Sequence, residues 1–244
     1  MYAIITGSNG GQWTTPSQIV SYLVAVIGYI IFILVELKAK EPIIPLTFFK
    51  NRRFITINVL SFCTMAITIG MSAYVPLYAQ TTLGQNATVG GLLLTPLSLF
   101  WTFGAMLISM YIGKLANKYF MLMGTIFLMT GTLLMTQFQM DTSLAYVVIC
   151  SGIVGLGMGF ISPLLIITLQ QTVAPAQVGT ATGFNSFTNT FSQALGAALY
   201  GVLFNIALHT EANSFVSGIR AVYMLAVAFA IIAFICVCTI RVKK

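Results

Sequence analysis

The sequence predicts an all-α membrane protein, a multi-pass bundle of about seven transmembrane helices. Of its 244 residues, 58% are hydrophobic and only 6% are charged, whereas soluble domains carry about 25% charged residues. With 11 Lys and Arg and 4 Asp and Glu, the chain has too few charges to cover the surface of a soluble globule. Composition therefore excludes soluble enzymes, and no catalytic residues, cofactor or metal site are expected.

Seven apolar runs divide the chain, and each is long enough to cross the hydrocarbon core as a helix of about 20 residues. None shows the alternation of apolar and polar residues that is typical of barrel strands. The runs are Gln18 to Leu37, Phe54 to Ala79, Gly91 to Ile112, Phe120 to Gln139, Ser143 to Thr168, Gly183 to Leu208, and Ile219 to Ile240.

The basic residues fall in alternate connections between these runs, which predicts the orientation of the chain. Ten of the eleven lie in the linker 38–53, the second connection after it, and the tail 241–244: Lys38, Lys40, Lys50, Arg52, Arg53, Lys114, Lys118, Arg241, Lys243 and Lys244. Because basic residues collect in cytoplasmic loops, we expect a cytoplasmic C-terminus and an outer N-terminus. The net charge of +7 thus indicates orientation and not a nucleic-acid partner.

The first 17 residues do not fit a complete helix or a signal peptide. Met1 to Ile5 is apolar but far too short to span, and a polar, turn-rich stretch follows it. We interpret residues 1–17 as an outer loop with the stump of a preceding helix. The chain is therefore hypothesised to be the C-terminal portion of a larger protein.

Three amides in the sixth run form the most informative polar pattern. Asn185, Asn189 and Gln193 are spaced i, i+4 and i+8, which places them on one face of a helix. Polar groups in hydrocarbon are costly unless they are paired or face a cavity. The stripe therefore indicates either the wall of a substrate path or hydrogen bonding between helices.

Three further side chains are candidates for contact with a hydrophobic substrate. Phe187 flanks the amide stripe, and Asn58 and Met65 follow helical spacing in the second run. Aromatic and Met surfaces repack around variable apolar ligands. The alternative for Met65 and Phe187 is a place in the bundle core or against lipid.

The fifth run combines small residues with a proline. Ser151, Gly155 and Gly159 are spaced i, i+4 and i+8, and Pro163 follows. Small residues at this spacing let helix backbones approach closely, and proline removes a helical hydrogen bond. We expect a packing seam and a hinge here.

Three segments resemble the C-terminal part of the major facilitator superfamily, in its fourteen-helix drug/proton antiporter branch. They are Glu41 to Leu46 with Phe49 to Phe54, Tyr74 to Gln80, and Gly113 to Tyr119. The last is similar to the superfamily's cytoplasmic loop motif, represented here by Gly113, Lys114, Asn117 and Lys118. Asn117 stands where that motif usually has Asp, so an ion pair at that position is lost.

The resemblance implies a domain organisation. Residues 18–37 would be an inserted linker helix, 38–53 a cytoplasmic linker, 54–240 a C-terminal six-helix transporter bundle and 241–244 a cytoplasmic tail. No acidic residue lies at mid-membrane depth in any run, so the resemblance assigns proton-coupling carboxylates to an N-terminal bundle that this chain lacks.

The resemblance also implies a function. It would be multidrug efflux by alternating access and proton antiport across the cell membrane, with amphipathic, often cationic compounds as substrates. The chain would be inactive without its N-terminal bundle. The alternative is a seven-helix receptor-like or regulatory membrane protein without transport activity.

Overall fold

The computed structural model describes residues 46–111, 117–210 and 214–240, together with five helical residues that precede them: Ile19, Val20, Leu23, Val24 and Ile27. The predicted helix 18–37 otherwise lies outside the described residues, as do residues 1–17 and the tail 241–244. Within the described ranges, six helices are long and apolar enough to cross a membrane. The all-α, multi-pass prediction is confirmed.

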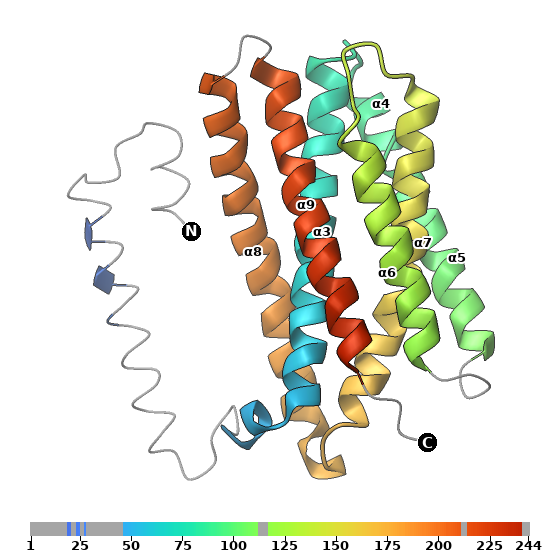
Figure 1. Cartoon of the computed structure of the whole chain (residues 1–244), viewed down its shortest axis with the longest axis vertical. Coiled ribbons are helices and arrows are strands. Elements are labelled where there is room, and N and C mark those ends of the chain that lie inside the picture. The colour runs from blue at the N-terminus through green and yellow to red at the C-terminus, as the bar shows by residue number, and fades with distance from the viewer. Residues whose placement is uncertain are drawn as a thin grey trace.

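The long helices follow one another along the bundle (Figure 1), and short helices precede α3, α5 and α8. In chain order they are η1 (Leu46–Lys50), α3 (Arg52–Thr81), α4 (Ala87–Leu92), α5 (Thr95–Tyr111), α6 (Asn117–Met135), α7 (Leu144–Gln170), η2 (Pro175–Gln177), α8 (Val178–Thr210) and α9 (Ser214–Thr239).

Two groups of three helices make up the bundle. In one group α3, α8 and α9 pack against each other, and in the other α7 packs between α5 and α6. Contacts between α6 and α9, and fewer between α3 and α7, join the two groups. The helices α3 and α7 are the most buried, while α8 and the α4–α5 span are the least buried.

Side-chain caps mark where several helices begin. The side chain of Asn51 accepts a hydrogen bond from the backbone N–H of Arg53 at the start of α3, and Asn86 caps α4 in the same way. Such caps satisfy backbone donors that have no partner within the helix. The third apolar run is divided between α4 and α5 just before Pro96, where proline supplies no backbone donor.

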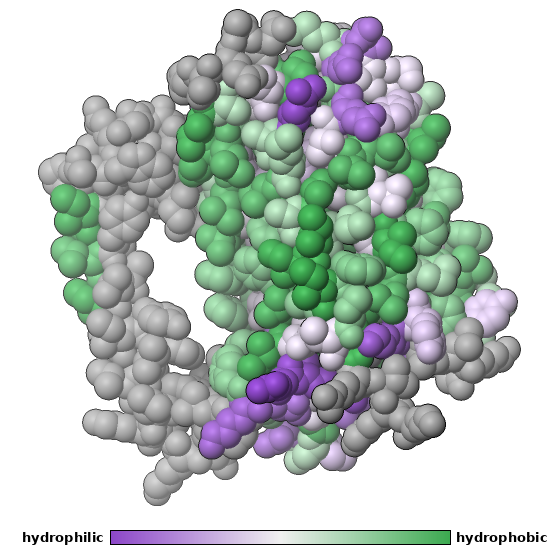
Figure 2. Space-filling model, in the orientation of Figure 1, coloured by the Kyte–Doolittle hydropathy of each residue, from purple (hydrophilic) through white to green (hydrophobic). Residues whose placement is uncertain are grey.

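The surface has the layered polarity of a membrane protein. Figure 2 shows an apolar band across the middle of the face in view, with hydrophilic atoms gathered at its two ends. The interior is rich in aromatic rings; Tyr78 stacks on Phe138 with 4.8 Å between ring centroids, and Tyr223 meets Phe138 edge-on. These rings join α3 and α9 at Phe138, which follows α6.

Candidate substrate-path surface on α3 and α8

The first two amides of the predicted stripe are brought to α3. Asn185 of α8 is buried and donates from Nδ2 to Oδ1 of Asn58 at 3.2 Å and to Oγ of Ser61 at 3.1 Å. Asn58 is buried too, and its Nδ2 donates to the carbonyl of Phe54 at 3.0 Å. The side-chain amides of Asn58 and Asn185 therefore both have partners within the protein, as buried amides require.

Asn189 extends these contacts by one helical turn. Its Oδ1 accepts from Oγ of Ser61 at 2.6 Å, and its Nδ2 donates to Oδ1 of Asn185 at 3.5 Å. We call Asn58, Ser61, Asn185 and Asn189 the amide network. Asn189 is only half-buried, so it lies where the network meets the surface of the described bundle.

The structure thus divides the predicted stripe between two environments. Asn58 and Asn185 hold α3 and α8 together, which is the interhelical alternative. Gln193 is half-buried and takes no part in the amide network. Ser61 shares the helical spacing of Asn58 in the sequence, but only the packing of α3 on α8 shows that it bridges the two helices.

The two apolar candidates lie in different surroundings. Phe187 is 61% exposed and stacks on Phe191, with 5.9 Å between ring centroids. Met65 is half-buried on α3 and packs against the buried core. Phe187 is therefore available for contact with another molecule, whereas Met65 contributes part of its surface to the interior.

Phe187 belongs to a wider uncovered surface of α8, which we call the open face. Its exposed residues are Gly179, Gly183, Ser186, Phe187, Thr190 and Phe191. A Cβ added at Gly179 or Gly183 would meet nothing within 4 Å. The exposed side chains along the middle of α9 are instead aliphatic: Met224, Ile231, Ile232 and Ile235. Residues 179–191 of α8 thus expose different chemistry from the middle of α9, while Leu199 and Ile206, farther along α8, expose aliphatic surface as α9 does.

Three glycines of α7 lie against the backbones of α5 and α6. A Cβ at Gly155 would stand 2.4 Å from the carbonyl oxygen of Leu97, and one at Gly159 would stand 2.4 Å from that of Trp101, both on α5. Gly157 faces α6, where its Cβ would approach the carbonyl of Gly124 at 2.7 Å. We call these contacts the glycine seam.

The other two residues of this predicted region occupy the interior of α7. Ser151 is buried, and its Oγ has no hydrogen-bond partner among the described residues. Pro163 lies within α7, which continues to Gln170. Gly157 was not among the predicted packing residues, although its position two residues from both Gly155 and Gly159 places it on another face of the helix.

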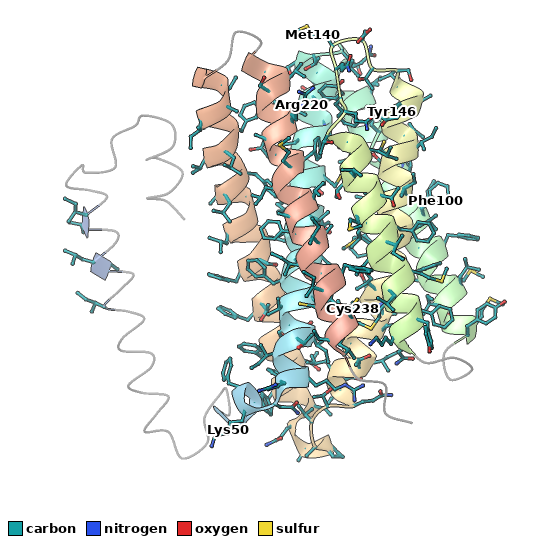
Figure 3. All side chains as sticks on the ribbon, viewed as in Figure 1. Lys50, Phe100, Met140, Tyr146, Arg220 and Cys238 are labelled. Carbon is teal, nitrogen blue, oxygen red and sulfur yellow. The ribbon has the colours of Figure 1, made fainter. Side chains whose placement is uncertain are left out.

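The cytoplasmic loop motif is described only in its second half. Gly113 and Lys114 lie outside the described residues, and Asn117 is the first residue of α6. Lys118 donates from Nζ to the backbone carbonyl of Cys238 at 2.8 Å, in the last turn of α9. A cation is favourable at a helix C-terminus, where carbonyl groups lack partners. Figure 3 shows Cys238 toward the end of the bundle that carries Lys50.

Comparison with known proteins gives the family. The Major Facilitator Superfamily model matches residues 3–197. The chain belongs to this superfamily.

Three of its relatives carry names that refer to multidrug resistance or multidrug transport. Multidrug resistance protein 3 of Bacillus subtilis is 30% identical over 90% of the chain, and the multidrug transporter protein MdtP of the same organism is 29% identical over 84%. Multidrug resistance protein Stp of Mycobacterium tuberculosis is 28% identical over 82%. The matches cover 43%, 38% and 37% of these relatives, so the chain spans about two fifths of their length.

Proposed function

We propose that this chain is the C-terminal bundle of a multidrug efflux transporter of the cell membrane. It would work by alternating access and proton antiport, together with an N-terminal bundle. The observation that carries this proposal is the open face of α8, which is built from small, hydroxyl and aromatic residues and is left uncovered by the described helices.

The open face is unsuited to contact with lipid alone. Lipid-facing surfaces favour aliphatic side chains, which α9 supplies. Small and hydroxyl residues such as Gly183, Ser186 and Thr190 instead allow close approach of another helix or line a polar cavity. Transporters of alternating access place substrate between two bundles that rock about a central site. The open face has the chemistry of such a boundary.

The side chains beside the open face suit amphipathic substrates. Phe187 and Phe191 provide stacked aromatic surface, and a ring face attracts an organic cation. Asn189 and Gln193 lie beside them with half-buried amides, while Asn58 and Asn185 anchor this wall to α3. Met65 would add adaptable apolar surface. These residues form the substrate path that we propose.

The positions of the charged residues support both the orientation of the chain in the membrane and the assignment of proton coupling to a second bundle. Lys50, Arg52, Arg53 and Lys118 lie at one end of the bundle, which we assign to the cytoplasm. Asp141 is the sole carboxylate among the described residues and lies in the connection between α6 and α7. It is therefore outside the hydrocarbon core, and the proton-coupling carboxylates are assigned to the other bundle.

Transport in proteoliposomes tests this proposal. The chain is reconstituted alone and with the N-terminal part of its superfamily relative Multidrug resistance protein 3, and movement of a lipophilic cationic dye is followed under an imposed proton gradient. We expect gradient-dependent transport with both parts and none with the chain alone. Transport by the chain alone would contradict the assignment of proton coupling to a second bundle. Physical association of the two parts without transport would instead favour a regulatory membrane protein.

A further inference from the structure

A group of cations lies where η1 meets α3, apart from the proposed substrate path. Lys50 ends η1, and Arg52 and Arg53 are the first two residues of α3. Lys50 and Arg52 are exposed. The Nε atom of Arg53 is buried and has no hydrogen-bond partner among the described residues. Three basic residues therefore lie within four positions of the chain, at the end of the bundle where Figure 3 shows Lys50.

No carboxylate among the described residues neutralises these charges. Its sole described carboxylate, Asp141, follows Met140, which Figure 3 shows at the opposite end from Lys50. The first turn of α3 contains no acidic residue. A helix N-terminus favours negative charge, so Arg52 and Arg53 stand where a cation is least favourable. An external anion would relieve both the repulsion among the cations and their repulsion from the helix end.

The surface next to these cations is apolar. Arg52, Ile55 and Val59 are spaced i, i+3 and i+7 and therefore share one face of α3. Ile55 is 39% exposed and Val59 is 37% exposed. Phe49 is 46% exposed beside Lys50, and its ring packs edge-on against Phe184. A positive end followed by an apolar face matches the two parts of an anionic phospholipid.

We propose that Lys50, Arg52 and Arg53 bind the headgroup of an anionic phospholipid whose acyl chain lies along Ile55 and Val59. The ligand class is a phosphodiester lipid with net negative charge, such as phosphatidylglycerol. The cations bind the phosphate group that a lipid headgroup and free phosphate have in common. The apolar face binds only the lipid, through its acyl chain. Binding at this site is independent of the proposed transport activity.

Competition between lipids tests the site. The purified chain in detergent is mixed with equal amounts of dioleoylphosphatidylglycerol and dioleoylphosphatidylcholine, and native mass spectrometry measures how much of each lipid is retained. We expect a preference for phosphatidylglycerol that Arg52→Gln reduces about fivefold, the factor equivalent to about 1 kcal/mol for one basic residue near the membrane surface. Arg53→Gln should act in the same direction.

A matched variant separates this site from general electrostatic attraction. Arg220→Gln removes the same charge from an exposed position on α9, toward the opposite end of the bundle (Figure 3), and should leave the lipid preference unchanged. An equal loss in Arg220→Gln, or no preference in the unmodified chain, would overturn the proposal. Arg52 is exposed, so its variant decides the question even where Arg53→Gln prevents folding.

A second arm distinguishes the lipid from free phosphate. Val59→Ser should weaken retention of phosphatidylglycerol, and excess inorganic phosphate should displace only part of the lipid. Complete displacement by inorganic phosphate, with Val59→Ser unchanged, would assign the cations to a soluble anion and overturn the proposed lipid site.

Discussion

The α5–α7 and α3–α8 interfaces hold their helices together by different means. The first relies on the glycine seam, where Gly155 and Gly159 leave no room for a Cβ between the helix backbones. The second relies on the amide network, in which Asn185 bonds to Asn58 and Ser61 across the interface. The glycine seam contains no polar side chain that could exchange a protein partner for a ligand. The amide network ends at the half-buried Asn189, which has a polar group to offer to a ligand.

This difference separates a fixed part of the bundle from an adaptable one. Close backbone packing depends on shape and is disrupted by any added atom. Hydrogen bonds between side chains in a membrane contribute little individually, because the separated groups also find other partners. Substitutions in the glycine seam should therefore lower the free energy of unfolding most, and substitutions in the amide network should lower it less.

The largest effect is expected from filling the glycine seam. Gly155→Leu places a side chain where the carbonyl oxygen of Leu97 lies 2.4 Å from the added Cβ. Overpacking costs about 1–3 kcal/mol or more, and we expect a loss of free energy of unfolding at the upper end of this range. Unfolding of the chain by sodium dodecyl sulfate in mixed micelles measures it.

A glycine in open surroundings provides the control. Gly183→Leu makes the same substitution where nothing lies within 4 Å of the added Cβ, and it should leave stability nearly unchanged. Equal losses in Gly155→Leu and Gly183→Leu would show that the substitution itself, and not the close packing of α5 on α7, causes the effect.

A smaller effect is expected from breaking the amide network. The coupling energy between Asn58 and Asn185 is obtained from Asn58→Leu, Asn185→Leu and the double variant. We expect about 0.6 kcal/mol, and at most about 1.7, as for other interhelical hydrogen bonds in membranes. A coupling energy of zero in the same unfolding assay would mean that this bond does not hold α3 to α8.

The smallest effect is expected from removing one hydroxyl. Ser61→Ala deletes the donor to Asn189 and one acceptor of Asn185, and we expect a loss of about 0.5 kcal/mol, near the lower end for a single hydrogen bond. Ser192 is a matched control because, among the described residues, its buried hydroxyl bonds only to the backbone carbonyl of Asn189 in its own helix. A larger loss in Ser192→Ala would remove the distinction between bonds across the interface and bonds within α8.

Composition was sufficient to predict the class, and the lengths of the apolar runs were sufficient to predict the six described membrane helices, because lipid imposes one length and one polarity on every spanning segment. The predicted run Phe54 to Ala79 agrees closely with α3 (Arg52–Thr81). Boundaries were less accurate where local geometry intervened, as at Pro96, where the third run is divided into two helices.

The partners of the polar residues were not predictable in the same way. Helical spacing placed Asn185, Asn189 and Gln193 on one face, but their surroundings depend on which helix packs there. Asn58 is 127 residues from Asn185, and Lys118 is 120 residues from Cys238. No local pattern specifies such pairs; they follow from the packing of α3 on α8 and of α6 on α9.

The most direct test of the substrate path is efflux by the longer protein that would contain this bundle. Asn189→Leu removes the half-buried amide beside the open face. Asn205→Leu is the control, because within the described part of the chain that amide donates only to the carbonyl of Gly201 in the same helix. The account predicts at least about fivefold slower efflux of several cationic substrates for Asn189→Leu, the cost of one lost hydrogen bond, and little change for Asn205→Leu. Unchanged efflux of every substrate in Asn189→Leu would contradict it.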